Sequence, residues 1–189
     1  LSSSTAKGIM AEIGYSGYLP EGRFLPDTYL FPAGTTDVEF LRRACSAMDQ
    51  VLEEEWHARA QDVPYSGPYQ ALIMASLVEE EAAAPEERSR IAGVFARRLQ
   101  LGMRLQTDPT IIYALGENFD GNIRRADLAL DSPFNTYLNT GLPPTPIAMP
   151  GRAAIHAALH PDAGNALYFV ARGDGTHEFS ASLEEHNKA

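Results

Sequence analysis

The clearest hydrophobic pattern in the chain runs from residue 35 to residue 57. Apolar side chains recur there three and four residues apart, at Val38, Leu41, Cys45, Met48 and Leu52. This spacing places them along one face of a helix, which can then pack on a core. The preceding Thr35-Thr36-Asp37 offers side-chain oxygens of the kind that begin helices. We therefore predict an amphipathic scaffold helix over these residues.

Other stretches also have helical character. Residues 69–84 are rich in Ala, Leu, Ile and Met and contain neither Gly nor Pro. Residues 85–102 place Pro85 in a first helical turn and end at Gly102, as helices commonly do. Asp108 is predicted to be the N-cap of a short helix that reaches Leu115. Further short helices are predicted within residues 6–13, over residues 152–160, and from a capping box at Ser182.

Strand signals are fewer and shorter. Residues 166–171 and 177–180 flank Gly173-Asp174-Gly175, which predicts an antiparallel hairpin. Residues 103–107 alternate in polarity like a strand, and a short strand is predicted near residues 28–31, after the turn at Pro26-Asp27. These elements predict an α+β fold, with helices packed on a small, mainly antiparallel sheet. One catalytic domain is expected to occupy residues 1–189.

Residues 132–151 form the longest stretch without a helix or strand pattern. The segment holds five prolines together with Asn135 and Tyr137, and a flexible linker would be richer in Ser, Gly and charge. Long loops inside compact domains are commonly functional. We expect this one to form a rigid, shaped wall.

Composition narrows the possible partners. The 189 residues carry a net charge of -10, which argues against a nucleic-acid surface, since phosphate binding requires a basic one. Sugars, proteins and neutral substrates remain. The single cysteine, Cys45, excludes an internal disulfide. No apolar run approaches the ~20 residues that span a bilayer. The chain starts at Leu1 without a signal peptide, so we expect it to be a piece of a longer protein.

The candidate chemistry centres on three consecutive acids, Glu79, Glu80 and Glu81, at the end of the helix predicted over residues 69–84. Residues two apart on a helix point about 200° apart, so the first and third acid face different ways. On composition alone, a solvated acidic helix end is the simpler explanation of the triplet. A Glu held against apolar neighbours would instead have its pKa raised from about 4.3 toward neutrality and could donate a proton.

Most glycosidases pair such an acid with a second carboxylate. Asp108 is a candidate for that role, although helix capping also accounts for it, so a mechanism with one carboxylate stays open. The histidine spacing matches no metal-binding motif, and no glycine-rich phosphate loop is present in the sequence. We therefore expect no metal and no cofactor.

Several long motifs, in order along nearly the whole chain, are similar to those of the endolytic murein transglycosylases, the MltG or YceG-like family. They are Glu21-Gly22-Arg23-Phe24-Leu25-Pro26-Asp27-Thr28-Tyr29, Ala75-Ser76-Leu77-Val78-Glu79-Glu80-Glu81, Val94-Phe95-Ala96-Arg97-Arg98-Leu99, Gly102-Met103-Arg104-Leu105-Gln106-Thr107-Asp108-Pro109-Thr110-Ile111-Ile112-Tyr113, Ser132-Pro133-Phe134-Asn135-Thr136-Tyr137, Gly141-Leu142-Pro143-Pro144-Thr145-Pro146-Ile147, Leu167-Tyr168-Phe169-Val170 and His186-Asn187.

The resemblance implies a bacterial lyase that cuts peptidoglycan glycan strands internally. The bond is the β-1,4 link from N-acetylmuramic acid to N-acetylglucosamine, and the product is a 1,6-anhydro end. Glu81 matches the family's catalytic acid, which acts as both acid and base, so no second carboxylate is required. Glu79, Gln106, Asn135 and Tyr137 are the residues we expect to bind substrate.

Two positions depart from the family pattern. Glu80 stands where a Lys is common, and Met149 stands where an Asn is common. The resemblance also implies a membrane helix and a LysM-like domain, and we expect residues 1–189 to form the catalytic domain without either of them. Family members are expected at the extracytoplasmic side of the cytoplasmic membrane, beside cell-wall synthesis enzymes, where they terminate nascent strands. The fragment itself is expected to be soluble.

Two alternative functions are weighed against this one. The first is a muramidase-type hydrolase that uses Glu81 with Asp108 and adds water to the cleaved bond. The second is a cell-wall binding module without catalytic activity. The chemical nature of the product ends and the effect of replacing Glu81 distinguish the three possibilities.

Overall fold

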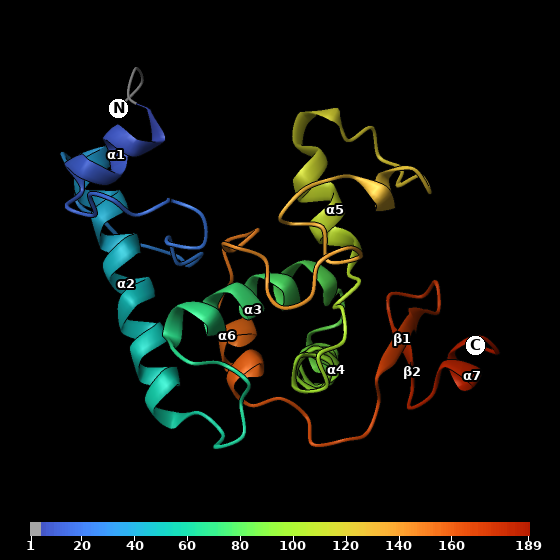
Figure 1. Cartoon of the computed structure of the whole chain (residues 1–189). Helices are drawn as coiled ribbons and strands as arrows, with labels where there is room; N and C mark the ends of the chain where they lie inside the picture. Colours follow the sequence, from blue (N-terminus) through green and yellow to red (C-terminus); the bar gives the residue numbers. More distant parts are fainter. Residues whose placement is uncertain (1–4) are drawn as a thin grey trace.

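The structure is a computed structural model that describes residues 5–189, and its central element is helix α3, Pro68–Glu81 (Figure 1). Every residue of α3 from Ala71 to Val78 is buried. The helix is surrounded by α2 (Asp37–Ala58), α4 (Arg88–Gln100), α5 (Asp108–Leu115) and α6 (Arg152–Leu159). Because α3 is apolar on all sides, it can lie only inside a core. Its acidic end is the point where it leaves that core.

Helix α2 confirms the prediction from the hydrophobic pattern. Thr36 is the N-cap, and its side chain and that of Glu39 form a capping box. Cys45, Met48 and Leu52 are buried, as the spacing predicted. The helix is the longest in the structure, yet no helix in the described residues is long and apolar enough to cross a membrane.

The N-terminal segment packs on the far side of α2. Helix α1, Ala6–Glu12, confirms the short helix predicted within residues 6–13. Met10 and Ile13 are buried together with Cys45 in a second, smaller apolar cluster. This cluster lies apart from the main core around α3 and α6.

Short 3-10 turns connect the larger helices. Pro85–Glu87 (η1) leads into α4, and Gly116–Asn118 (η2) and Asp127–Ala129 (η3) follow α5. The start of α5 differs by one residue from the prediction. Thr107 is the N-cap and Asp108 is the first residue of the helix. The carboxylate of Asp108 is therefore not used as a cap.

The C-terminal part is a hairpin followed by a short helix, as predicted. Strands β1 (Tyr168–Ala171) and β2 (His177–Ser180) pair antiparallel, with Phe169 opposite Phe179. Phe169 also meets Phe95 of α4 edge to face, with ring centroids 5.7 Å apart. Helix α7, Leu183–His186, starts at a capping box and packs on both strands. The α+β class is thus confirmed.

The two other predicted strands do not form. In the described residues the sheet has two strands, and residues 103–107 and 28–31 are irregular. The alternation in the first segment is real, because Leu105 and Thr107 are buried while Gln106 is exposed. No neighbouring strand lies beside the segment to pair with it, and strands need such a partner. In the second segment Leu30 and Phe31 are exposed.

Candidate active site

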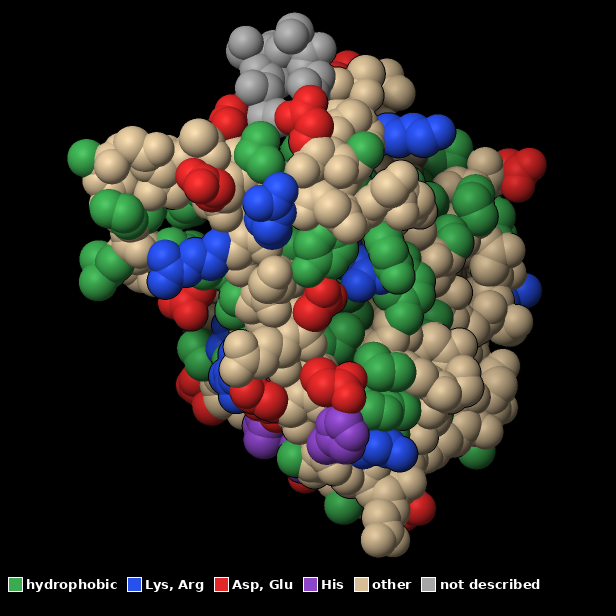
Figure 2. Space-filling model, turned by 90° about the vertical axis from the view of Figure 1, so that its left-hand side faces the viewer, with side chains coloured by type: hydrophobic (Ala, Val, Ile, Leu, Met, Phe, Trp, Pro, Cys, Tyr) green, Lys and Arg blue, Asp and Glu red, His purple; other side chains and the backbone are tan. Residues whose placement is uncertain are grey.

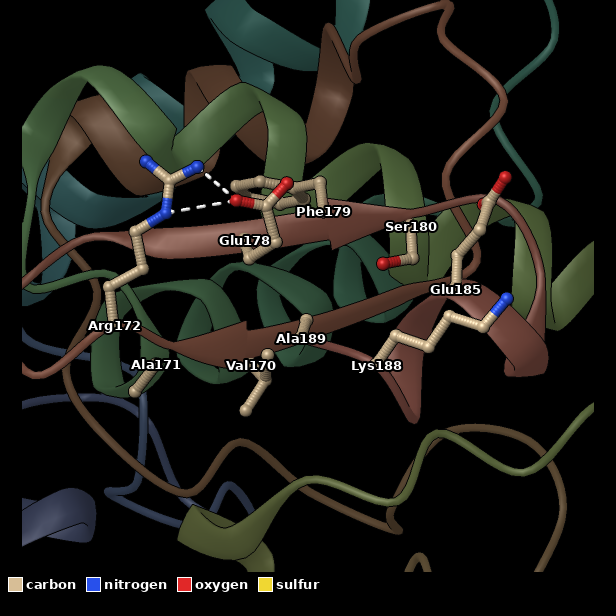
Figure 3. A pocket seen from close by; sticks show the side chains of 9 residues that line it. All are labelled: Val170, Ala171, Arg172, Glu178, Phe179, Ser180, Glu185, Lys188 and Ala189. Carbon is tan, nitrogen blue, oxygen red and sulfur yellow. Dashed lines mark hydrogen bonds and ion pairs between the residues drawn. The ribbon is translucent and has the colours of Figure 1, made fainter.

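Three cavities of similar size lie on the surface, with volumes of about 570, 650 and 680 Å³. The 650 Å³ cavity lies on the outer face of the hairpin, where Arg172 pairs with Glu178 (Figure 3). The 680 Å³ cavity lies between α2 and the loop that carries Tyr18 and Arg23. Size does not distinguish the three. The 570 Å³ cavity differs because it is lined by Glu81, an acid whose pKa is raised by burial.

We call the 570 Å³ space the Glu81 cavity. One wall comes from the end of α3, the start of α5 and the loop after residue 131, and the other from the hairpin, α7 and Arg98 of α4. Its lining residues are Glu81, Arg98, Gln106, Asp108, Tyr137, Tyr168, Phe169, Val170, Ala171, His177, Leu183, His186 and Asn187.

Glu81 is the last residue of α3, and its environment favours the protonated form. Burial raises the pKa of its carboxyl above the ordinary value, and the negative charge of Asp108 raises it further. A hydrogen bond from Thr107 and the charge of His177 act in the opposite direction without cancelling the rise. The carbonyl end of a helix also disfavours a carboxylate. Glu81 therefore holds its proton to higher pH than an ordinary Glu does, as a general acid requires.

The carboxyl of Glu81 is oriented by a threonine. Thr107 Oγ1 donates a hydrogen bond of 2.5 Å to Glu81 Oε2. Thr107 is itself fixed, because its backbone N–H donates to Thr136 Oγ1 at 3.1 Å and its carbonyl accepts from Thr110 Oγ1 at 2.7 Å. The hydroxyls of Thr110 and Thr136 lie 2.8 Å apart. All three threonines are buried, so the acid has a rigid support.

Gln106 precedes this support and has an unusual backbone. Its φ is 52°, in the left-handed region that non-glycine residues rarely adopt. Its backbone N–H donates to the carbonyl of Thr136 at 3.1 Å, which holds the conformation. The side chain is exposed at the cavity. Strain of this kind is often retained where a side chain must be aimed at a site.

Asp108 and Tyr137 are joined across the same wall. The Tyr137 hydroxyl donates a hydrogen bond of 2.5 Å to Asp108 Oδ1. Burial raises the pKa of Tyr137 above its ordinary value, and the bond to Asp108 raises it further, so the phenol stays protonated. This bond holds the Asp108 side chain at the wall of the cavity that Glu81 also lines.

Asn135 does not line the Glu81 cavity. It is fully buried, and its Nδ2 donates to the carbonyls of Leu128 and Leu130 at 3.1 and 2.8 Å. Its Oδ1 accepts from the backbone N–H of Tyr137 at 2.8 Å. The side chain thus shapes the loop that presents Tyr137, which agrees with the predicted rigid wall.

Glu79 also points away from the cavity, as the helical geometry predicted for acids two apart. Its Oε2 accepts a hydrogen bond of 2.9 Å from the backbone N–H of Gly151, the N-cap of α6. Its Oε1 lies 3.7 Å from Nη2 of Arg88. Glu80 is exposed on the outside of the helix. The structure therefore brings Glu81, Gln106 and Tyr137 together, and it does not bring Glu79 or Asn135 to them.

The residues on the cavity wall that faces Glu81 were not identified from the sequence. Arg98 Nε donates to the carbonyl of Leu167 and Nη1 to that of Leu105, each at 2.7 Å. Its guanidinium also lies 5.0 Å from the ring centroid of Tyr168, on which His186 stacks at 5.3 Å. Burial lowers the pKa of Arg98. The motifs around residues 98, 168 and 186 were a signal, but their meeting depends on tertiary packing.

His177 closes the wall between the hairpin and η1. Its Nδ1 lies 2.8 Å from Glu87 Oε2, and both side chains are buried. The backbone N–H of His177 also donates to this carboxylate at 3.1 Å. Burial raises the pKa of Glu87, but the contacts with His177 outweigh it and leave the pKa below its ordinary value. This pair holds β2 against the element that follows α3.

The sequence is similar to one family of known proteins over nearly its whole length. The model of the YceG-like family matches residues 2–189. An endolytic murein transglycosylase of Bacillus subtilis (strain 168) is 43% identical over 169 residues, which are 89% of this chain and 46% of that protein. The endolytic murein transglycosylase of Streptococcus pneumoniae serotype 2 is 34% identical over 178 residues, 90% of this chain and 32% of that protein.

A solved structure from the same family has a similar fold. The crystal structure of a YceG-like protein from Listeria monocytogenes superposes with a TM-score of 0.76 at 40% sequence identity. The match covers 88% of this chain and 54% of that one. This chain therefore spans about half or less of the length of the proteins it resembles.

Proposed function

Because this chain belongs to the YceG-like family, we propose that the Glu81 cavity binds peptidoglycan glycan strands and cleaves them as a lytic transglycosylase. The observation that carries the proposal is Glu81 itself, a half-buried acid with a raised pKa on the wall of an open cavity. Polar and aromatic side chains suited to a sugar surround it.

The proposed reaction needs one catalytic carboxyl. Glu81 donates its proton to the oxygen of the β-1,4 bond between N-acetylmuramic acid and N-acetylglucosamine, and the bond from C1 to that oxygen breaks. The C6 hydroxyl of the muramic residue then attacks C1. The carboxylate of Glu81 takes the hydroxyl proton, so the acid is restored and a 1,6-anhydro end forms without addition of water.

Asp108 has a supporting role in this proposal. The sugar ring gains positive charge when the bond breaks, and a fixed anion nearby stabilises that charge. Asp108 lines the cavity and is held by Tyr137. Gln106 and Tyr137 remain the proposed substrate-binding residues, joined on the opposite wall by Tyr168 and Arg98.

Glu79 and Asn135 act at a distance from the substrate in this proposal. The bond from Gly151 to Glu79 links the end of α3 to the start of α6. Asn135 shapes the loop that carries Tyr137. We therefore assign both as positioning residues. We further propose that the protein works at the extracytoplasmic side of the cytoplasmic membrane beside cell-wall synthesis enzymes, where cleavage ends the growth of nascent strands.

Mass spectrometry of digested glycan strands tests the reaction. The wild-type chain should release fragments with 1,6-anhydro ends, and Glu81→Gln should lower the rate by at least about 100-fold, as expected when a general acid is lost. Anhydro ends formed equally fast by both proteins would refute the role of Glu81.

The position of Asp108 in the same cavity as Glu81 is also compatible with an alternative function, a hydrolase in which two carboxylates act together. Such an enzyme would give reducing ends that carry the elements of water, which the same mass spectra reveal. The other rival is a binding module. It predicts that wild type and Glu81→Gln bind glycan alike and that neither releases product.

A further inference from the structure

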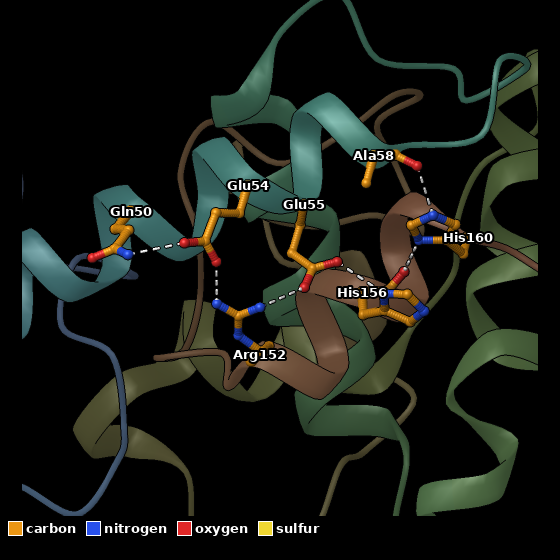
Figure 4. A network of polar contacts seen from close by, with 7 residues as sticks. All are labelled: Gln50, Glu54, Glu55, Ala58, Arg152, His156 and His160. Atoms are coloured by element: carbon orange, nitrogen blue, oxygen red, sulfur yellow. Dashed lines mark hydrogen bonds and ion pairs between the residues drawn. The ribbon is translucent and has the colours of Figure 1, made fainter.

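A cluster of two histidines and a glutamate lies where α2 packs against α6. None of the three residues lines the Glu81 cavity. Glu55 is on α2, His156 is on α6, and His160 caps the end of α6 (Figure 4). One possible ligand atom from each lies within 4.8 Å of the other two. His156 and His160 are four residues apart, a helical spacing that places two imidazoles on one face.

We propose that Glu55, His156 and His160 form a binding site for a divalent transition-metal ion, with Zn²⁺ as the best-suited metal. Two imidazole nitrogens and one carboxylate oxygen are a common ligand set for Zn²⁺, with the fourth position left to water. Mg²⁺ and Ca²⁺ prefer oxygen ligands and are disfavoured by two nitrogens.

Metal ligands in proteins are usually held in place by further hydrogen bonds to neighbouring groups, and these side chains have such bonds. Glu55 Oε1 accepts a hydrogen bond of 3.1 Å from Arg152 Nη1, while Oε2 lies 2.8 Å from His156 Nδ1. His160 Nε2 lies 2.9 Å from the carbonyl oxygen of Ala58. A neutral imidazole that donates through Nε2 has its lone pair on Nδ1.

The position of that lone pair is the strongest argument. His160 Nδ1 lies 3.1 Å from the carbonyl oxygen of His156, which also carries a lone pair. A neutral His160 can satisfy only one of its two carbonyl neighbours as a donor. A cation bound at Nδ1 resolves this conflict. The rings of His156 and His160 also stack with centroids 4.1 Å apart, so the two imidazoles lie side by side in the cluster.

Charge and access support the same assignment. Arg152 bonds to Glu54 and to Glu55, so one guanidinium faces two carboxylates and one negative charge remains for a bound cation. The His156 side chain is 57% exposed and that of Glu55 10%, so an ion can enter from solvent. The face of the molecule drawn in Figure 2 carries histidine side chains next to acidic and basic ones.

Calorimetric titration of the chelator-treated chain with ZnCl₂ tests the site. We expect one bound ion per chain, and we expect His156→Gln and His160→Gln each to weaken binding at least tenfold. His57→Gln is the matched control, because His57 is an exposed histidine on α2 outside the cluster. It should bind Zn²⁺ like the wild type.

Thermal unfolding supplies a second readout. Zn²⁺ should raise the Tm of the wild type and of His57→Gln, because an ion that joins α2 to α6 binds only the folded chain. It should leave the Tm of His156→Gln unchanged, and this variant should fold because its side chain is exposed. Absence of zinc binding by the wild type, or equal affinity in all four proteins, would overturn the proposal.

Discussion

Thr107 donates a hydrogen bond of 2.5 Å to Glu81, and the donor comes from the N-cap of α5 while the acceptor is the last residue of α3. The end of one helix and the start of another therefore meet at the proposed catalytic acid. The bond favours the charged carboxylate and so opposes the effect of burial on the pKa. Removing it should alter both the position and the pKa of the acid.

Thr107→Val tests this relationship. We expect the rate of glycan cleavage to fall about 10- to 100-fold, as for loss of a hydrogen bond to a charged group worth about 1.5–3 kcal/mol. The pKa of Glu81 should rise, so the decline of the rate at alkaline pH should shift upward. Thr35→Val, far from the cavity, is the control and should leave the pH profile unchanged.

Asp108→Asn should move the same profile in the opposite direction. The charge of Asp108 raises the pKa of Glu81, so neutralising it should lower that pKa. Because the proposed acid must be protonated, the alkaline decline should begin at lower pH. Rates measured across a pH series for wild type and variant check this, and an unchanged or upward-shifted decline would contradict it.

Glu81→Gln should increase stability at high pH. The folded state raises the pKa of Glu81, so it binds the proton more tightly than the unfolded chain does. The stability that this proton supplies is complete below the unfolded pKa and is lost as pH rises through the folded pKa. Gln resembles the protonated acid. The Tm of the variant should therefore exceed that of wild type at pH 8 and approach it near pH 4, and a constant difference would argue against burial as the cause.

Glu79→Ala should affect stability more than chemistry. The substitution leaves the N–H of Gly151 without its acceptor and removes a partner of Arg88, at a cost of about 1–2 kcal/mol. Denaturant unfolding should show that loss, whereas the pH of the alkaline decline should stay at the wild-type value. A shifted decline with unchanged stability would instead place Glu79 at the substrate.

Asn135→Ala should weaken both stability and activity. It removes the N–H groups that bond to two partly buried carbonyls and the acceptor for the N–H of Tyr137, at a cost of about 1–3 kcal/mol for groups left unpaired. Tyr137→Phe offers the comparison, because it keeps the loop and loses the bond to Asp108. Asn135→Ala should lower the Tm more than Tyr137→Phe does.

Local signals in the sequence were enough for much of the fold. The N-cap residues before α2, the apolar stripe of α2 and the Gly-Asp-Gly turn of the hairpin depend on residues close together in the chain. The acid at Glu81 was also predictable, because a helical run ends there in carboxylates and the motif around it resembles a known family.

Tertiary contacts account for what the sequence did not show. Nothing local indicates that Thr107 would reach Glu81, 26 residues away, or that Arg98 would hold the segment before β1. Residues 103–107 alternate like a strand, but a strand needs a neighbour that the fold does not supply. Likewise, the helical spacing of His156 and His160 gains a third ligand only when α6 packs against α2.

The burial of α3 has a consequence for how such proteins can diversify. The proposed proton donor, Glu81, is positioned by the hydrophobic centre of the domain, whereas the facing side of the cavity belongs to a hairpin held by α4 and η1. Mutations in that hairpin can reshape the fit for a new saccharide while the acid stays in place. Substrate range can thus change through the hairpin side of the cavity without displacing Glu81.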